Sequence, residues 1–173
     1  MKTSKRLSYM AICLALALLT ASRVHAHGEA HRDTHRNVTP RKFNPAQVEA
    51  TAFGQEGNPA KVTRTIQISM DDTMRFNPGT LTVQKGETVR LRVANRGAVM
   101  HELVIGTPKE LAEHADLMRK FPDMQHEAPH MAHVKPNEWG DIVWQFTQAG
   151  EFQFACLIPG HYEAGMIGKV VVK

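Results

Sequence analysis

Three side chains of different metal-binding chemistry lie on one short segment near the C-terminus. Cys156, His161 and Met166 are separated by four residues in each case, within Cys156-Leu-Ile-Pro-Gly-His-Tyr-Glu-Ala-Gly-Met166. A further imidazole, His101, follows the run Val-Ala-Asn-Arg-Gly-Ala-Val-Met100 far upstream. A fold that brings the two segments together would place one thiolate, two imidazoles and one thioether around a single point.

Two histidines and one cysteine with a weak, distant methionine are the donor set of a mononuclear electron-transfer copper site. The thiolate suits both oxidation states of copper, the imidazoles hold the cupric form and the thioether favours the cuprous form. The donor set therefore predicts copper as the cofactor, bound by His101, Cys156, His161 and Met166.

Other interpretations of these four residues are weaker. A lone cysteine in an apolar strand is usually a buried small side chain, and a lone methionine usually fills a core. A cysteine and a histidine can also form a nucleophile and its base. Zinc normally takes a fourth cysteine, histidine or carboxylate, and a thioether is a poor zinc ligand. Spacing, donor types and the surrounding strand pattern agree best with copper.

The first 26 residues are typical of a secretory signal peptide. Basic residues come first, the stretch 7–19 is mostly apolar, and Val24-His25-Ala26 fits a small-residue cleavage site. The apolar stretch is short for a membrane span, so we expect cleavage after Ala26, a periplasmic location and no stable membrane insertion. Cys13 leaves with this segment, and the remaining Cys156 has no internal disulfide partner.

The positive net charge of the full chain does not indicate nucleic-acid binding. The full sequence has 21 basic and 17 acidic residues. Four of the basic residues and none of the acidic ones lie in the predicted signal peptide, which leaves 17 of each sign. A mature chain without net charge gives no indication of nucleic-acid binding or of a strongly charged partner.

Apolar and polar residues alternate over most of residues 61–173, which predicts half-buried strands in one domain. The expected inward-facing residues are Val62, Ile66, Ile68, Met70, Leu81, Val83, Val89, Leu91, Val93, Ile142, Trp144, Phe146, Phe152, Phe154, Val170 and Val172. Many short strands separated by turn residues indicate an all-β sandwich of two sheets. We assign Trp139 and Trp144 to its core. Cys156 continues the inward-facing series of Phe152 and Phe154.

One helix is expected among the strands. Thr107, Pro108 and Glu110 supply an N-cap, a first-turn proline and a capping-box glutamate. Leu111, Ala115 and Met118 would form its apolar stripe, and it would end near Phe121-Pro122. The residues from there to Pro136 are expected to form a loop.

Two segments carry additional soft donors. Residues 27–60 are expected to form an extended tail, partly ordered at best, with histidines at His27, His31 and His35. The helix and the loop after it contribute His114, Met118, Met124, His126, His130, Met131 and His133. These residues are candidates for secondary copper binding. The alternatives are a solvated polar tail, core packing by Met118 and Met124, and surface histidines.

The segment Gly150-Glu-Phe-Gln-Phe-Ala-Cys156, together with His161, Met166 and Gly168-Lys-Val-Val-Val172, resembles the plastocyanin and azurin group of blue copper proteins, the cupredoxins. Asn95 to His101 resembles their strand with the first histidine. Within the group, the motif at 101–107, the pair Glu113-His114 and the Met/His-rich insert are most similar to periplasmic cupredoxins linked with copper tolerance.

The resemblance implies a Greek-key β-sandwich with a copper site near one end. His101, Cys156 and His161 would be close, roughly trigonal ligands and Met166 the axial ligand. Backbone N–H groups, from Glu102 and Ile158, would bond to the sulfur. The chain departs from azurin at Glu102 and Leu157, where azurin has polar residues that tie the two loops together.

Two functions follow, and they can coexist. One is copper tolerance in the periplasm by sequestration, cuprous oxidation or delivery, with extra ions on the tail or insert. The other is mobile electron transfer to a periplasmic redox protein, a cytochrome or oxidase, through the edge of His161, with Leu157 and Pro159 nearby as an apolar docking patch. An enzyme is disfavoured: Cys156 faces inward rather than lying at an exposed helix N-terminus, and turnover in cuprous oxidation is not readable from sequence.

Overall fold

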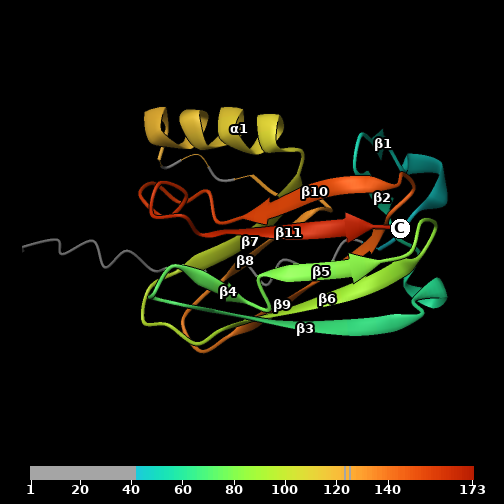
Figure 1. Cartoon of the computed structure of the whole chain (residues 1–173), viewed down its shortest axis with the longest axis horizontal. Coiled ribbons are helices and arrows are strands. Elements are labelled where there is room, and N and C mark those ends of the chain that lie inside the picture. Colours follow the sequence, from blue (N-terminus) through green and yellow to red (C-terminus); the bar gives the residue numbers. More distant parts are fainter. Residues whose placement is uncertain (1–41, 123, 125) are drawn as a thin grey trace, which may run out of the picture. The chain divides into compact units, whose positions relative to one another are not determined.

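Two β-sheets face each other in the computed structural model, which describes residues 42–122, 124 and 126–173 (Figure 1). The first sheet has the order β1 (Ala50–Thr51), β2 (Gly54–Glu56), β9 (Trp139–Gln145), β6 (Thr88–Asn95), β3 (Arg64–Asp71) and β4 (Arg75–Asn77). The second has the order β5 (Thr80–Val83), β11 (Ile167–Val172), β10 (Gly150–Ala155), β7 (His101–Gly106) and β8 (Met131–Val134). Most neighbours are antiparallel, but β3 with β6 and β5 with β11 are parallel. The predicted β-sandwich is confirmed.

The core lies between the sheets and is built from the predicted alternation. Val89, Leu91 and Val93 on β6 are fully buried, while the arginines between them bond to Asp141 on β9. From the other sheet, Phe154 packs edge-on against Phe76 with ring centroids 4.9 Å apart. The period of two therefore places large apolar side chains in the core from both sheets.

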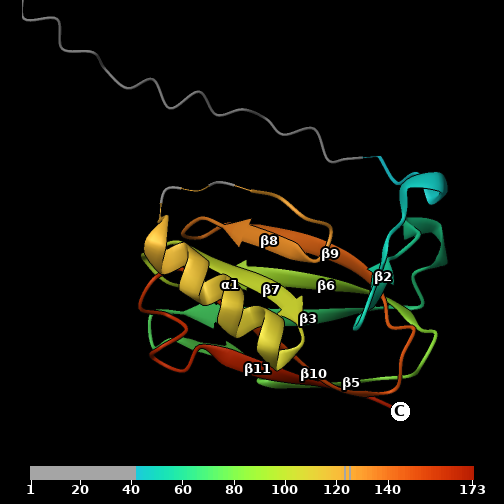
Figure 2. The same ribbon diagram turned by 90° about the horizontal axis from the view of Figure 1, so that it is seen from above.

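The predicted helix is confirmed as α1 (Pro108–Lys120). Thr107 caps it, and the reciprocal capping-box bonds with Glu110 are both present. Its apolar stripe packs on the second sheet, beside Val104, Ala155 and Leu157, and Figure 2 shows α1 lying over this sheet. The helix is thus fixed next to the strands that carry His101 and lead to Cys156.

Two predictions about residues 122–140 are wrong. The expected loop up to Pro136 contains β8, whose four residues pair with β7 from His101 to Val104. Three of its four residues, Met131, Ala132 and Val134, are buried. A strand this short therefore shows no clear alternation of apolar and polar residues. Trp139 is 62% exposed rather than part of the core, and the Arg92 guanidinium lies over its ring at 4.5 Å. Trp144 is buried, as expected.

Residues 42–60, expected to be extended tail, contain short regular elements. They are two 3-10 turns, Pro45–Gln47 and Pro59–Lys61, and the β1–β2 pair. Phe53 between these two strands is buried and stacks on Trp144, whose Nε1–H donates to the Phe53 carbonyl at 3.1 Å. This part of the chain therefore contributes to the core. Among the described residues, no helix has the length and apolar character needed to cross a membrane.

The pairing of β10 with β11 depends on a glycine at position 168. Gly168 lies opposite Phe154, and a β-carbon at this position would overlap the Phe154 ring. We expect Gly168→Ala to lower the free energy of unfolding by about 1–3 kcal/mol, because the buried ring must leave its place. Urea unfolding of the copper-free protein measures this value. Gly79→Ala is the control, since its β-carbon meets only the Phe76 carbonyl at 3.5 Å. Equal loss in both variants would contradict the argument.

Candidate metal centre

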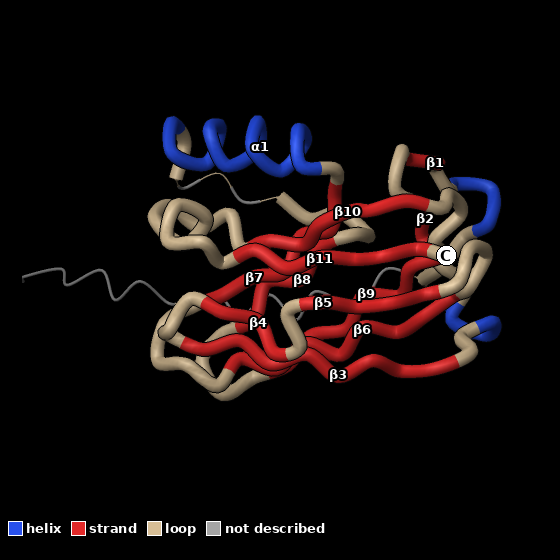
Figure 3. Tube along the Cα trace, in the orientation of Figure 1, coloured by secondary structure: helices blue, strands red, loops and turns tan. Residues whose placement is uncertain are grey.

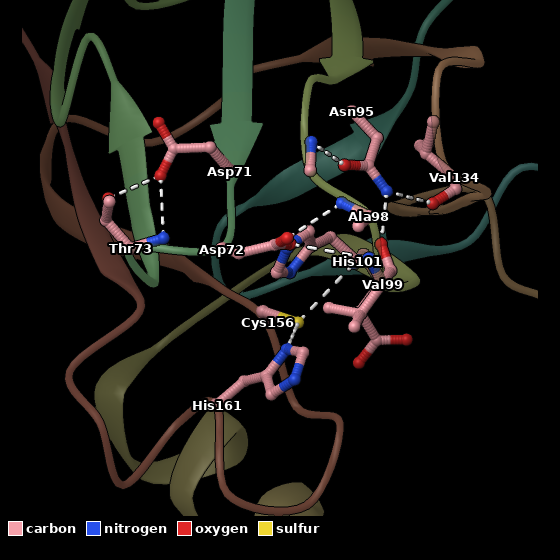
Figure 4. Close-up of polar contacts among 12 residues, drawn as sticks. Asp71, Asp72, Thr73, Asn95, Ala98, Val99, His101, Val134, Cys156 and His161 are labelled. Carbon is pink, nitrogen blue, oxygen red and sulfur yellow. Dashed lines mark hydrogen bonds and ion pairs between the residues drawn. The ribbon is translucent and has the colours of Figure 1, made fainter.

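His101, Cys156 and His161 lie close together, as Figure 4 shows. His101 begins β7, Cys156 follows β10, and His161 lies on the loop between β10 and β11, drawn as a tan loop in Figure 3. One potential ligand atom from each of the three residues lies within 4.8 Å of the others. Among the residues that the structure describes, this is the one group of its kind. His101 and Cys156 are fully buried.

The ring nitrogens that face this point are Nδ1 atoms. Cys156 Sγ lies 3.2 Å from His161 Nδ1. His101 Nδ1 is buried without a hydrogen-bond partner among the described residues. A buried polar atom left unpaired costs about 1–3 kcal/mol, so native structures rarely keep one without a reason. A metal ion that accepts the Nδ1 lone pair supplies that reason, and the residues present therefore fit one.

Met166 closes the same loop. Its backbone N–H donates to the His161 carbonyl at 3.0 Å, and its carbonyl accepts from the Cys156 N–H at 3.1 Å. These bonds fold the chain back on itself, so that Met166 enters the core beside Cys156. The side chain is fully buried. The loop thus holds the thioether on the same side of the sheet as the thiol.

Asp72 fixes the orientation of the first histidine, and the sequence analysis missed it. Its Oδ1 lies 3.0 Å from His101 Nε2, while its Oδ2 accepts from the Ala98 N–H at 2.7 Å. A carboxylate on the outer nitrogen leaves Nδ1 free for a metal. The Ala98 N–H and then His101 lower the pKa of Asp72, which keeps it ionised. A β-carbon at Gly97 would overlap this carboxylate, so the glycine permits the contact.

Glu102 ties the two ligand-bearing segments together. Its backbone N–H donates to Cys156 Sγ at 3.4 Å, and its Oε1 accepts from the Leu157 N–H at 2.8 Å. The expected bond from Glu102 to the sulfur is therefore present, and the Ile158 N–H also bonds to it. Glu102 and Leu157 are the positions at which the chain departs from azurin. Here the buried Glu102 carboxylate links the two segments by its bond to the Leu157 N–H.

Burial sets the proton affinity of the site. It raises the pKa of the Cys156 thiol to about 12, although the Glu102 and Ile158 N–H groups act in the opposite direction. Burial and the neighbouring His101 lower the pKa of His161. At neutral pH without a metal, the thiol is protonated and His161 is neutral. A metal ion bound through Cys156 would therefore displace the thiol proton.

The other candidate donors differ in their surroundings, and His130 is near enough to His114 and His126 for their charges, after burial, to lower its pKa. His27, His31 and His35 lie outside the described residues. Met118 and Met131 pack in the apolar cluster beneath α1, and the Met124 side chain is exposed. The His130 ring lies edge-on to Phe53 and Trp144. The structure brings His114, His126 and His133 together, and His133 lies opposite Glu102 on β7.

A profile of copper-binding proteins of the plastocyanin/azurin family matches residues 62–173. The chain belongs to this family. Among curated proteins it is 48% identical over 165 residues to the copper-resistant cuproprotein CopI of Rubrivivax gelatinosus, with 94% of each chain covered. It is 31% identical to CopI of Pseudomonas aeruginosa, over 70% of this chain and 83% of that protein. As a cupredoxin close to the CopI proteins, it has copper as its cofactor.

Solved structures show the same fold. Auracyanin B aligns with a TM-score of 0.58 at 22% identity, over 72% of this chain and 96% of that one. Auracyanin A, a blue copper protein of Chloroflexus aurantiacus, aligns with a TM-score of 0.54 at 28% identity, over 63% of this chain and 98% of that one. The cupredoxin sandwich therefore accounts for the described strands around the three donors.

Copper uptake by the metal-free protein should release the Cys156 proton. With a thiol pKa of about 12, binding at pH 8 should release about one proton per copper, and the apparent affinity should rise about tenfold per pH unit from pH 7 to pH 9. A pH indicator in weakly buffered solution measures the release. Cys156→Ala should release none. Wild-type protein that also releases no proton would show that the thiol is not a ligand.

Proposed function

We propose that this protein holds one redox-active copper ion between His101, Cys156, His161 and Met166 and acts in copper tolerance in the periplasm. The observation that carries this proposal is the convergence of three donors from two distant segments, with His101 Nδ1 buried and unpaired. The 48% identity to a copper-resistant cuproprotein supports the physiological role. The predicted signal peptide 1–26, followed by a tail and the cupredoxin domain 61–173, supports the location.

Copper in such a site supplies one-electron chemistry between its cuprous and cupric forms. The protein's part is to fix the donors in advance. Asp72 orients His101, Glu102 anchors the Cys156 segment, and the backbone bonds of Met166 close the loop. Because these contacts come from the protein itself, the donors need little rearrangement when the oxidation state changes. We propose a binding and redox role rather than turnover of a substrate.

Electron transfer to a periplasmic redox protein is the second candidate function. His161 is partly exposed, in contrast to His101, so its outer edge is the nearest point of the centre to solvent. Leu157, expected in the docking patch, is buried beneath α1. The exposed apolar side chains beside the site are instead Val99 and Met100, which precede His101, and Pro159. A small apolar patch of this kind suits a transient partner.

Replacing the thiol tests the main proposal. Cys156→Ser should abolish the intense visible charge-transfer band, because that band requires a thiolate bound to cupric copper. In a strain that lacks the native gene, this variant should also fail to restore growth on copper, whereas the wild-type gene should restore it. Equal amounts of protein in the periplasmic fraction are the control. Growth restored by Cys156→Ser would show that tolerance does not depend on this centre.

The proposed axial position gives a separate prediction. Met166→Leu should retain copper and its visible band but raise the reduction potential, since a donor to cupric copper is lost. The rise is about 60 mV for each tenfold loss of cupric relative to cuprous affinity. Redox titration followed at the visible band measures it. Complete loss of copper from this variant would show that Met166 is more than a weak ligand.

A further inference from the structure

Three histidines from three different segments gather at α1 and β8, outside the group formed by His101, Cys156 and His161. His114 lies on α1, His126 lies in the connection from α1 to β8, and His133 lies on β8. The ring centroids of His114 and His126 are 4.6 Å apart, and those of His126 and His133 are 6.3 Å apart. The connection after α1 thus places the His126 ring between those of a helix and a strand.

His126 resembles His101 in having a buried ring nitrogen for which the described part of the chain supplies no hydrogen-bond partner. Both of its ring nitrogens are buried and have no hydrogen-bond partner among the described residues. His101 Nδ1, which faces the first centre, shares this property. A neutral imidazole carries one donor and one acceptor, and a folded protein normally pairs buried groups of this kind. The unpaired ring of His126 therefore points to a ligand that takes its nitrogen lone pair.

The spacing of the rings suits a metal ion. Imidazole nitrogens bind metals at about 2.0 Å, which places the centroids of two rings on the same ion roughly 4.5–6.5 Å apart. The two centroid separations, 4.6 and 6.3 Å, lie in this range. The nitrogens of these rings are not yet as close together as the donor atoms of the first centre. A metal site at this place therefore requires the side chains to rotate about their own bonds until their nitrogens face one ion.

The charges around the cluster also favour a cation. Burial, and then the neighbouring His126, lower the pKa of His114, so its imidazole is neutral and its lone pair is free at pH 7. On the opposite side, Glu102 Oε2 lies 3.2 Å from His133 Nδ1. A carboxylate on one ring nitrogen directs the other toward a metal. Beneath α1, Met118 and Met131 contribute apolar packing rather than charge.

We propose that His114, His126 and His133 bind a second metal ion, copper(II), separate from the centre of His101, Cys156 and His161. Three imidazoles suit cupric copper, zinc or nickel, and the order of affinities among divalent ions favours copper over zinc. This site deepens the proposed tolerance function, because it would raise the copper capacity of the chain. It stands on its own residues and does not require the first centre to be redox-active.

Glu102 connects the two sites. One carboxylate oxygen contacts His133, the other accepts the Leu157 N–H, and the Glu102 backbone N–H bonds to Cys156 Sγ. A cation on His133 would draw this carboxylate toward itself and alter the hydrogen bonds around the sulfur. Loading of the second site should therefore shift the visible band of the first copper.

The test titrates copper(II) into protein that already holds its first copper. His27, His31 and His35 are replaced by alanine in every sample, so that the tail cannot contribute donors. Spin resonance should reveal a second cupric signal with several nitrogen donors. His126→Ala and His133→Ala should each weaken the second site at least tenfold, while the retained visible band reports an intact fold and an intact first centre.

His130→Ala is the matched control. It removes an imidazole from the same connection, but the His130 ring packs against Phe53 and Trp144. This variant should bind the second copper as the parent does. Unchanged binding in His126→Ala and His133→Ala, or an equal loss in His130→Ala, would overturn the assignment. Tighter binding of zinc than of copper in the same titration would overturn the choice of metal.

A last variant tests the connection between the sites. Glu102→Gln keeps the shape of the side chain but removes its charge. The second copper should still bind, and the shift of the first visible band that accompanies it should become much smaller. A shift of full size in Glu102→Gln would show that the two sites do not communicate through this carboxylate.

Discussion

The link between the start of β7 and the Cys156–Met166 loop is the contact on which the centre depends. Glu102 makes it twice, through its backbone N–H to the sulfur and through its carboxylate to the Leu157 N–H. Burial raises the pKa of this carboxylate, while the Leu157 N–H and His133 act in the opposite direction. A buried group of this kind is tolerated only with good partners. The bonds that Glu102 makes to both segments offset the unfavourable burial of its carboxylate.

Hydrogen bonds from the protein itself orient the donors. Asp72 orients His101 and is itself held by the Ala98 N–H. The Cys156 sulfur accepts bonds from the Glu102 and Ile158 N–H groups. The donors therefore lie at the start of β7 and on a loop whose two ends are held by backbone hydrogen bonds. Rigid donors resist the different geometries that cuprous and cupric copper prefer, and this resistance keeps the structural change between the two states small.

The sequence predicted what depends on local pattern. Period-two alternation located the core strands, cap residues located α1, and the donor types singled out His101, Cys156 and His161, which the structure brings together. It could not predict Asp72, the carboxylate contacts of Glu102 or the exposure of Trp139, because these depend on register across strands. Trp139 lies opposite Ala94 at the start of β9, where Arg92 rather than the core covers its ring. β8 escaped prediction because three of its four residues are buried, which hides the alternation.

The two clusters of donors differ in the protons that copper must displace. At the first centre the Cys156 thiol has a pKa of about 12 and must lose its proton to bind. In the proposed second site the donors are imidazoles, and burial lowers the pKa of His114, so no thiol proton opposes the ion at pH 7. His133 is also partly exposed, whereas His101 and Cys156 are fully buried. Cupric ions from solution should therefore reach the imidazole cluster more readily, and Glu102 lies between that cluster and the sulfur.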